Sequence, residues 1–408
     1  MNLRRTSTLS CACALGFIAA CSLAACSAIS GAPPKGADDA PPLEEAAAMK
    51  EVGAKAAGLI VWSSSRLGNH DLFTMKTDGS DIKQITSGDA VDWFPRFSPD
   101  GSRILFCRSK QGWVSERDAN DSDKWNILTI KPDGSSPSPV AESASWGSWI
   151  SNDEILFVRG TKIFRKQLGG DERQIMDSEG VPELDGALLQ QPELSKDGKY
   201  LAITLRGSKR ETGLWDLEKK TWTQTGLGCQ VNWTPDQTAI YWVHPTGNGG
   251  SRVLKMPITA GTPPKDPSLD ALEFMDLPGR RSHEYFPELS SDGKWMVWGA
   301  TQRGHDHDTA DYEIYLWEVG SAPDKAVRLT YNSGNDRWPD VFLPSAVASP
   351  PEPVATRAEP PPSEPAPQEL ASSERAQEPE EKAPPASHGK KQSAKASSSQ
   401  KKSKGGKP

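Results

Sequence analysis

A strand–turn–strand pattern recurs along this chain and restricts its fold more than any other feature. In its fullest form, residues 94–106, a strand with proline in second place leads into the turn Ser98-Pro99-Asp100-Gly101, and an apolar strand follows. Proline near a strand start costs little hydrogen bonding, and Pro followed by Gly favours a tight turn. Further copies, some of them degenerate, occupy 149–157, 191–203, 232–237, 286–298 and 338–342. Repeats at spacings of about 40–55 residues indicate a propeller or a solenoid.

Each copy is followed by a second half, which consists of an apolar strand, a turn and a further short strand. One unit therefore supplies four strands with period-2 alternation. The N-terminal piece, 59–86, supplies only three strands, and the C-terminal piece, 338–342, supplies one. Pairing these two pieces would close a ring and remove its exposed sheet edges. We therefore predict an all-β fold, a six-bladed β-propeller over residues 58–343, closed by pairing of its N- and C-terminal strands.

The repeated residues carry a family resemblance. The motif F-P-x-[FL]-S-x-D-G, together with D-[LI]-[FY]-x-M-x-x-D-G and Q-[IL]-T, resembles the TolB-type β-propeller repeat over about 58–343. The resemblance implies the fold more specifically than the function. TolB carries an α/β domain before its propeller and is a soluble periplasmic protein, whereas this chain shows a short tether and a lipidation signal. We therefore interpret the chain as TolB-like, and not as the TolB of the Tol–Pal system.

The N-terminus has the features of an export signal. Arg4 and Arg5 precede an apolar stretch, 14–20, that is too short for a permanent membrane span. Residues 23–26, Leu-Ala-Ala-Cys, resemble the lipobox of bacterial lipoproteins, which implies cleavage after residue 25 and lipidation of Cys26. An ordinary cleaved signal is the alternative, and Cys21 ends a second candidate lipobox. We prefer Cys26 because Leu is the commoner residue three places before the cysteine.

Several consequences follow from a signal peptide over 1–25. Ser27, a residue other than Asp after the lipidated cysteine, implies sorting to the outer membrane, on its periplasmic side or at the cell surface. The mature chain then keeps Cys26, Cys107 and Cys229, without a C-x-x-C pair. We expect Cys107 and Cys229 to be free buried thiols, although a disulfide between them stays open.

Two segments have a composition unsuited to a packed core. Residues 26–57 are rich in Ala, Pro, Gly and acidic residues, and we predict a disordered tether. Residues 344–408 are predicted to be a disordered tail, rich in Pro, Ala and Glu up to Glu381 and carrying eight lysines after it. The lysines either keep the tail solvated or bind peptidoglycan or another anionic polymer. The net charge of −7 and the lack of a basic groove with interleaved aromatic residues argue against nucleic-acid binding.

Catalytic motifs are missing from the sequence. No G-x-S-x-G elbow, Walker sequence or dinucleotide fingerprint occurs, so we predict a protein without enzymatic activity or an obligatory cofactor. A polar cluster in a loop between two strands combines imidazoles and carboxylates that could hold Ca²⁺ or a transition metal. Its candidate ligands are His305, Asp306, His307, Asp308 and Asp311. The alternative is a polar loop without metal, because the spacing fits no known ligand pattern.

The rim where the innermost strands begin is the predicted partner-binding surface. Three blades place an acidic, aromatic or arginine residue there, and such residues commonly anchor interfaces. The predicted contacts are Asp92, Trp93, Glu284, Tyr285, Asp336 and Arg337. We expect Trp93, Tyr285 and Arg337 to be exposed, and their neighbours Phe94, Phe286 and Trp338 to pack between blades.

These observations together predict an envelope lipoprotein, anchored in the membrane by its lipid, whose propeller is a platform for binding other envelope proteins. One alternative is a metal-binding propeller enzyme or a carbohydrate-binding protein that acts on envelope or extracellular polysaccharide. Another is a structural tether that connects the outer membrane to the cell wall through the lysine-rich tail.

Overall fold

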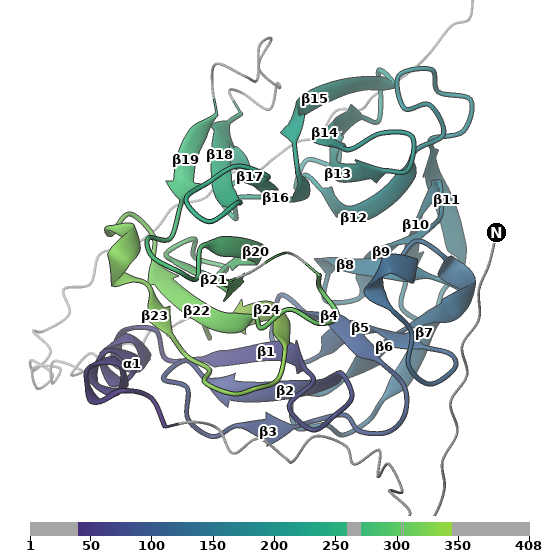
Figure 1. Cartoon of the computed structure of the whole chain (residues 1–408). Helices are drawn as coiled ribbons and strands as arrows, with labels where there is room; N and C mark the ends of the chain where they lie inside the picture. The colour runs from purple at the N-terminus through teal and green to yellow at the C-terminus, as the bar shows by residue number, and fades with distance from the viewer. Residues whose placement is uncertain (1–39, 259–270, 303, 305, 345–408) are drawn as a thin grey trace, which may run out of the picture. The chain divides into compact units, whose positions relative to one another are not determined.

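A ring of six four-stranded antiparallel sheets forms the protein (Figure 1). The computed structural model describes residues 40–258, 271–302, 304 and 306–344, all of which lie in the first of two compact units of the chain, residues 1–349. Each sheet is one blade, and we number the blades I to VI in chain order. The prediction of a six-bladed β-propeller is therefore confirmed.

Within each blade the strands follow one another outward from the axis of the ring. Blade I has β24 (Asp336–Phe342), β1 (Leu59–Ser64), β2 (Asp71–Lys76) and β3 (Lys83–Gln84). Blade II has β4 (Asp92–Phe97), β5 (Ile104–Ser109), β6 (Trp125–Ile130) and β7 (Ser138–Glu142). Blade III has β8 (Ser145–Ser151), β9 (Glu154–Arg159), β10 (Lys162–Gln167) and β11 (Glu172–Asp177). Blade IV has β12 (Leu188–Leu194), β13 (Tyr200–Arg206), β14 (Glu211–Asp216) and β15 (Thr221–Leu227). Blade V has β16 (Cys229–Trp233), β17 (Ala239–His244), β18 (Arg252–Pro257) and β19 (Leu272–Met275). Blade VI has β20 (His283–Leu289), β21 (Trp295–Thr301), β22 (Glu313–Glu318) and β23 (Val327–Arg328).

The two ends of the propeller meet in blade I, as the sequence predicts. Strand β24 pairs antiparallel with β1, in a register that places Leu59 opposite Phe342 and Ile60 opposite Val341. Trp338 in β24 is 1% exposed, so the closing strand also contributes a large side chain to the core. Closure thus supplies both backbone pairing and apolar burial.

The repeated turn has the geometry that its sequence favours. In blade II, Gly101 adopts a φ of 70° and its N–H donates to the carbonyl of Ser98 at 2.8 Å. The Ser98 hydroxyl donates to Asp100 at 2.6 Å, and the same serine–aspartate contact recurs in blades IV and VI. In the degenerate copy of blade V, Gln237 takes the left-handed conformation instead, with a φ of 62°. A side chain in that conformation costs roughly 1–2 kcal/mol, which the surrounding turn must offset.

Part of the predicted tether is helical. Helix α1 (Leu43–Lys55) lies against β23, and Met49, 8% exposed, packs over the turn at Gly79 (Figure 1). The prediction of disorder is therefore wrong for residues 43–55. An alanine-rich stretch with Glu44 and Glu45 in its first turn and Lys55 in its last favours a helix, and packing on the propeller stabilises it.

The remaining predictions for the chain ends fall outside the described residues. These are the signal peptide over 1–25 with Cys26, the first part of the tether, and the tail after residue 344. Within the part of the chain that the structure describes, no helix is both long enough and apolar enough to cross a membrane.

Candidate functional site

Every innermost strand contains a β-bulge at the same place. The register shifts in all six pairs of first and second strands. Within each shift one residue other than glycine takes a positive φ, between 51° and 62°: Phe94, Trp146, Gln191, Gln230, Phe286 and Trp338. Such bulges re-aim a side chain and hold local strain. The same strain occurs in six blades, which indicates a property of the repeat.

Four of these bulge residues form an aromatic plug at the axis. Trp338 lies 5.1 Å from Phe94, 5.5 Å from Trp146 and 4.1 Å from Phe286, measured between ring centroids. In the other two blades the bulge residue is a glutamine, and Gln230 accepts a hydrogen bond from the backbone N–H of Phe286. The aromatic plug therefore fills the centre of the ring with residues from four blades.

A polar ring follows the plug, formed by the residue two places after each bulge. Its members are Arg96, Ser148, Glu193, Asn232, Glu288 and Asp340. Arg96 pairs with Glu288, and Asp340 accepts a hydrogen bond from the backbone N–H of Phe97 at 2.7 Å.

The polar ring contains three carboxyl groups and one guanidinium. Burial raises the pKa of Glu193 to about 7, raises the pKa of Asp340, and raises the pKa of Glu288 well above its ordinary value, while the charge of Arg96 opposes each shift. These carboxyl groups therefore bind protons at a higher pH than exposed carboxyl groups do. Among the residues that the structure describes, no three His, Cys, Asp or Glu side chains are placed to hold a metal ion.

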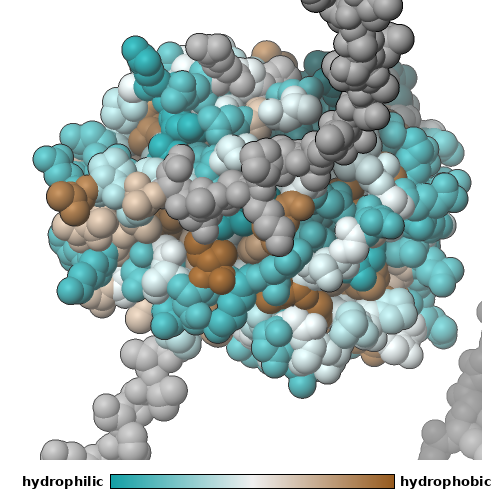
Figure 2. Space-filling model, turned by 60° about the horizontal axis from the view of Figure 1, so that its bottom comes forward, coloured by the Kyte–Doolittle hydropathy of each residue, from teal (hydrophilic) through white to brown (hydrophobic). Residues whose placement is uncertain are grey.

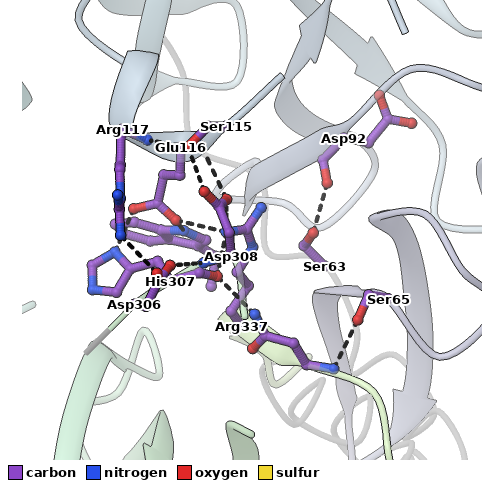
Figure 3. Close-up of polar contacts among 12 residues, drawn as sticks. Ser63, Ser65, Asp92, Ser115, Glu116, Arg117, Asp306, His307, Asp308 and Arg337 are labelled. Atoms are coloured by element: carbon purple, nitrogen blue, oxygen red, sulfur yellow. Dashed lines mark hydrogen bonds and ion pairs between the residues drawn. The ribbon is translucent and has the colours of Figure 1, made fainter. Parts of the chain in front are cut away.

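Two loops form a lid over the plug. Residues 110–124 connect β5 to β6 in blade II, and residues 302–312 connect β21 to β22 in blade VI. These blades flank blade I, and the loops meet above Arg337 of β24 (Figure 3). Arg337 Nη1 contacts Glu116 Oε2 at 3.0 Å and Asp308 Oδ1 at 3.1 Å. A cation from one blade thus joins carboxylates from two others.

Further hydrogen bonds fix the lid. The backbone N–H of Glu116 donates to Asp308 at 3.0 Å, the Ser115 hydroxyl also donates to Asp308, and His307 Nδ1 contacts Glu116 (Figure 3). Burial alone would raise the pKa of Asp308, but the hydrogen bonds from Ser115 and Glu116 and the charge of Arg337 lower it below its ordinary value. Asp308 is therefore ionised at neutral pH and strengthens the hydrogen bonds that hold the lid.

The predicted partner-binding residues are buried beneath this lid. Asp92, Trp93, Glu284, Asp336 and Arg337 are at most 1% exposed, and Tyr285 is 9% exposed. The prediction that Trp93, Tyr285 and Arg337 are exposed is wrong. Trp93 packs against Trp125 and Trp146, and Tyr285 packs against His307 of the loop of its own blade. Arg337 lies against Glu116 and Asp308 of the two lid loops. Phe94, Phe286 and Trp338 are buried as expected, but they pack at the axis in the plug.

The buried acidic residues of the rim have specific partners. Asp92 receives two hydrogen bonds from Arg108, at 2.7 and 2.6 Å, and Asp336 pairs with Arg66 at 2.9 Å. Glu284 accepts from the backbone N–H of Leu277 at 2.6 Å, and burial raises its pKa to about 9. Each of these acidic groups is buried, and each contact lies within one blade or the connection next to it.

The predicted metal ligands are also engaged elsewhere. His305 lies outside the described residues. Asp306 pairs with Arg117 at 2.7 Å and Asp311 with Arg281 at 2.7 Å, while His307 and Asp308 belong to the lid contacts with Glu116 and Arg337. The cluster therefore connects the loop of blade VI to its neighbours. Neither Cys107 nor Cys229 forms a disulfide, and burial raises the pKa of Cys107 to about 12.

Trp113 is the prominent residue that sequence reasoning missed. It is 61% exposed on the lid loop of blade II, whereas the other thirteen tryptophans are buried or half-buried. Leu67, 43% exposed, lies on the loop of adjoining blade I. We call the surface formed by the described residues of the loops 65–70, 110–124 and 302–312 the lid face. Long loops have no periodicity, so no sequence signal marks Trp113.

A different view of the molecule shows how apolar groups are distributed. Hydrophobic residues lie as separate small groups within a mostly hydrophilic surface (Figure 2). Single exposed apolar side chains are normal for soluble domains. An interface on this protein therefore needs specific anchors and cannot rest on a broad apolar patch of the face drawn there.

The repeat and the fold define the class: a TolB-like six-bladed β-propeller protein. The chain is 25% identical over 164 residues to a TolB homolog of Chlorobium luteolum, a match that covers 39% of this chain and 34% of that protein. It is 24% identical over 230 residues to an uncharacterized peptidase, YuxL, of Bacillus subtilis, covering 54% of this chain and 31% of the peptidase. The chain spans about one third of the length of these two curated relatives. No family model matches.

The solved structures show a similar likeness at low identity. TolB from Acinetobacter baumannii aligns with a TM-score of 0.49 and 15% identity, over 70% of this chain and 66% of that chain. An oligogalacturonate lyase in complex with manganese aligns with a TM-score of 0.38 and 13% identity, over 64% of this chain and 71% of that chain.

Proposed function

We propose that this protein is a non-enzymatic lipoprotein of the cell envelope whose propeller binds a partner protein through the lid face. The observation that carries the proposal is the exposure of Trp113 on a loop that buried ion pairs hold in place. Tryptophan and arginine are the residues that most often dominate binding energy at protein interfaces. The lipobox ending at Cys26 supports the envelope location, and the sequence match to a TolB homolog supports a binding role.

The lid face has the layout of a small interface. Asn69 Nδ2 donates to the carbonyls of Gly88 and Ala90, which joins the loop that bears Leu67 to the next connection along the chain. Leu67 and Trp113 supply apolar contact area on neighbouring blades. The exposed pair Arg117–Asp306 lies on the same lid and supplies polar groups for a rim. An apolar centre with a charged rim is typical of protein interfaces.

Pre-organisation supports binding at this surface. The hydrogen bonds of Glu116 and Asp308 order the lid loops before any partner arrives, so a partner need not supply that ordering free energy. The aromatic plug fills the axis directly beneath the lid. A surface site on the lid face is therefore more accessible to a ligand than a site at the axis.

Site-specific photo-crosslinking in intact envelopes tests this function. A photoreactive amino acid at Trp113 should give a discrete adduct with one partner protein. The same amino acid at Lys325, exposed in the β22–β23 connection on the opposite face, should not give that adduct. Identical adducts from both positions would contradict the lid face as the binding site. Stoichiometric metal in the purified protein, measured by elemental analysis, would favour the alternative of a metal-binding propeller enzyme.

The envelope location has its own test, which is lipidation at Cys26. Cys26→Ala should leave the precursor unprocessed or the product soluble, because the modified thiol is lost. Cys21→Ala is the matched control and should be processed like the parent. Labelling with a radioactive fatty acid and detergent partitioning measure both variants. Retention of label in Cys26→Ala would assign the modification to another cysteine.

A further inference from the structure

The outer edges of the blades differ in how they are protected. An exposed edge strand invites pairing with another chain, and proteins prevent this with short strands, charges or proline. Five of the six outer strands carry at least one such feature: β3 and β23 have two residues each, β7 contains Pro139 and Glu142, β11 contains Glu172, Arg173 and Asp177, and β19 contains Glu273. Strand β23 is also covered by helix α1.

Strand β15 of blade IV lacks this protection. Its seven residues, Thr-Trp-Thr-Gln-Thr-Gly-Leu, include neither a charged residue nor a proline. It pairs with β14 on one side, and within the described residues no strand pairs with its other side. Four of the seven residues, three threonines and Trp222, are of types that favour β-structure. Thr221 and Gln224 are exposed, and Leu227 is 56% exposed.

A bulge limits the stretch that can accept another strand. The register between β14 and β15 shifts at Thr225, whose hydroxyl lies 3.1 Å from that of Thr212 in the interior. Bulges twist a strand away from regular pairing. The regular part of the edge is therefore Thr221–Gln224, which directly follows the turn at Lys219 and Lys220.

The surroundings of this edge are basic. Residues 188–227 contain seven Lys and Arg against five Asp and Glu, a net charge of +2, in a chain whose net charge is −7. Lys219 and Lys220 are exposed immediately before β15, and Arg210 is exposed just before β14, at the end where β15 finishes.

We propose that the edge of β15 is a second docking site, which adds an extended segment of a partner protein as a fifth strand of blade IV. Backbone hydrogen bonds to Thr221–Gln224 would supply affinity, as in other cases of strand addition. The basic surroundings select a segment with an uncharged, β-favouring middle and acidic residues at its ends. This site is independent of the lid face, because it lies on the outer edge of a different blade.

A synthetic peptide, Glu-Asp-Thr-Val-Thr-Val-Thr-Glu-Asp, is the probe, and the full mature protein is the target. We expect saturable binding by fluorescence anisotropy, together with slower hydrogen exchange at residues 221–224. A peptide N-methylated at alternate residues, which cannot donate the same backbone hydrogen bonds, should not bind. Gln224→Lys should weaken binding at least several-fold, while Gln84→Lys, the same substitution on the outer strand β3, should leave it unchanged.

Reversing the charges with Lys219→Glu and Lys220→Glu should also weaken binding, most clearly at low salt. Thermal melting of every variant must match the parent, so that loss of binding is not loss of folding. Equal binding of the N-methylated peptide, or no change in exchange at 221–224, would overturn the proposal. So would a dimer of the parent protein that Gln224→Lys dissociates, because a second copy would then cover the edge. Trp113→Ala should not affect the peptide, which separates this test from that of the lid face.

Discussion

The indole Nε1 of Trp338 donates a hydrogen bond to Oε2 of Glu116 across 2.9 Å, which joins residues 222 positions apart in the chain. The contact connects the closing strand of the ring with the lid loop of blade II. Glu116 also contacts Nη1 of Arg337 at 3.0 Å, so one carboxylate binds a buried indole and a buried guanidinium. Glu116 therefore couples the lid to the closing strand, together with Asp308.

Replacing Glu116 with alanine should strongly destabilise the protein. Arg337 is fully buried, and removing one of its two carboxylates leaves a poorly compensated buried charge. Breaking such a pair typically costs about 3–5 kcal/mol, and the remaining Asp308 favours the lower end of that range. Asp118→Ala, which removes an exposed pair with Lys124 in the same loop, should cost under about 1 kcal/mol. Urea unfolding measures both, and equal costs would contradict the role of Glu116.

Glu284 should make stability fall as pH rises. Burial raises its pKa in the folded protein to about 9, so the folded state keeps a proton that the unfolded state loses from about pH 4.5 upward. The contribution of this proton is therefore complete at low pH and is lost between about pH 4.5 and 9, by up to roughly 1.4 kcal/mol per pH unit.

The variant Glu284→Gln removes this titration and keeps the hydrogen bond from Leu277. Measured by thermal melting, it should gain stability over the parent as pH rises from about 5 to 9. Glu179→Gln, at an exposed position, should follow the parent at every pH. A parent and a Glu284→Gln variant with parallel pH profiles would show that Glu284 is ionised in the folded protein.

Trp338 and Trp113 form a matched pair for testing the plug. Trp338→Ala removes a side chain that contacts three aromatic rings at the axis and should cost about 3–5 kcal/mol. Trp113→Ala should change the free energy of unfolding by less than about 0.5 kcal/mol, because its side chain is mostly in solvent. Similar losses for the two variants in urea unfolding would mean that the plug contributes no more than a surface residue.

Removing the closing strand should destabilise the whole ring. A chain ending at residue 336 loses the pairing of β24 with β1 and should unfold at a much lower temperature, whereas one ending at 344 should melt like the parent. A chain ending at 336 that melts normally would refute closure by this strand.

The lysine-rich tail should bind anionic polymer through charge alone. Eight lysines follow Glu381, the last acidic residue in the chain. Binding of this kind is screened over about 8 Å at physiological salt, so sedimentation with purified sacculi should decline steeply as salt is added. A chain ending at 381 should sediment less at low salt than the full mature chain. Equal sedimentation of the two chains would mean that the tail is only a solvated segment and does not bind the polymer.

The sequence determined the propeller, its blade number and its closure. Those features follow from local signals, namely the Ser-Pro-Asp-Gly turn at 98–101 and the strands with period-2 alternation. Such signals lie within a few neighbouring residues and do not depend on the rest of the chain. The sequence did not reveal the bulges, because residue types as different as Phe94 and Gln191 adopt the same positive-φ conformation at the bulge.

Only the tertiary structure decided which residues are exposed on the surface and which are buried. Trp93, Tyr285 and Arg337 looked like rim residues, but all three are buried. Other aromatic rings surround Trp93, and the lid loops cover Arg337. The acidic cluster at 306–311 resembled a metal site, yet its carboxylates contact Arg117, Arg281 and Arg337 from elsewhere in the chain. Exposure and pairing depend on residues that are far apart in the chain, such as Arg337 and Glu116, which are 221 positions apart. A local sequence pattern carries no information about such distant partners.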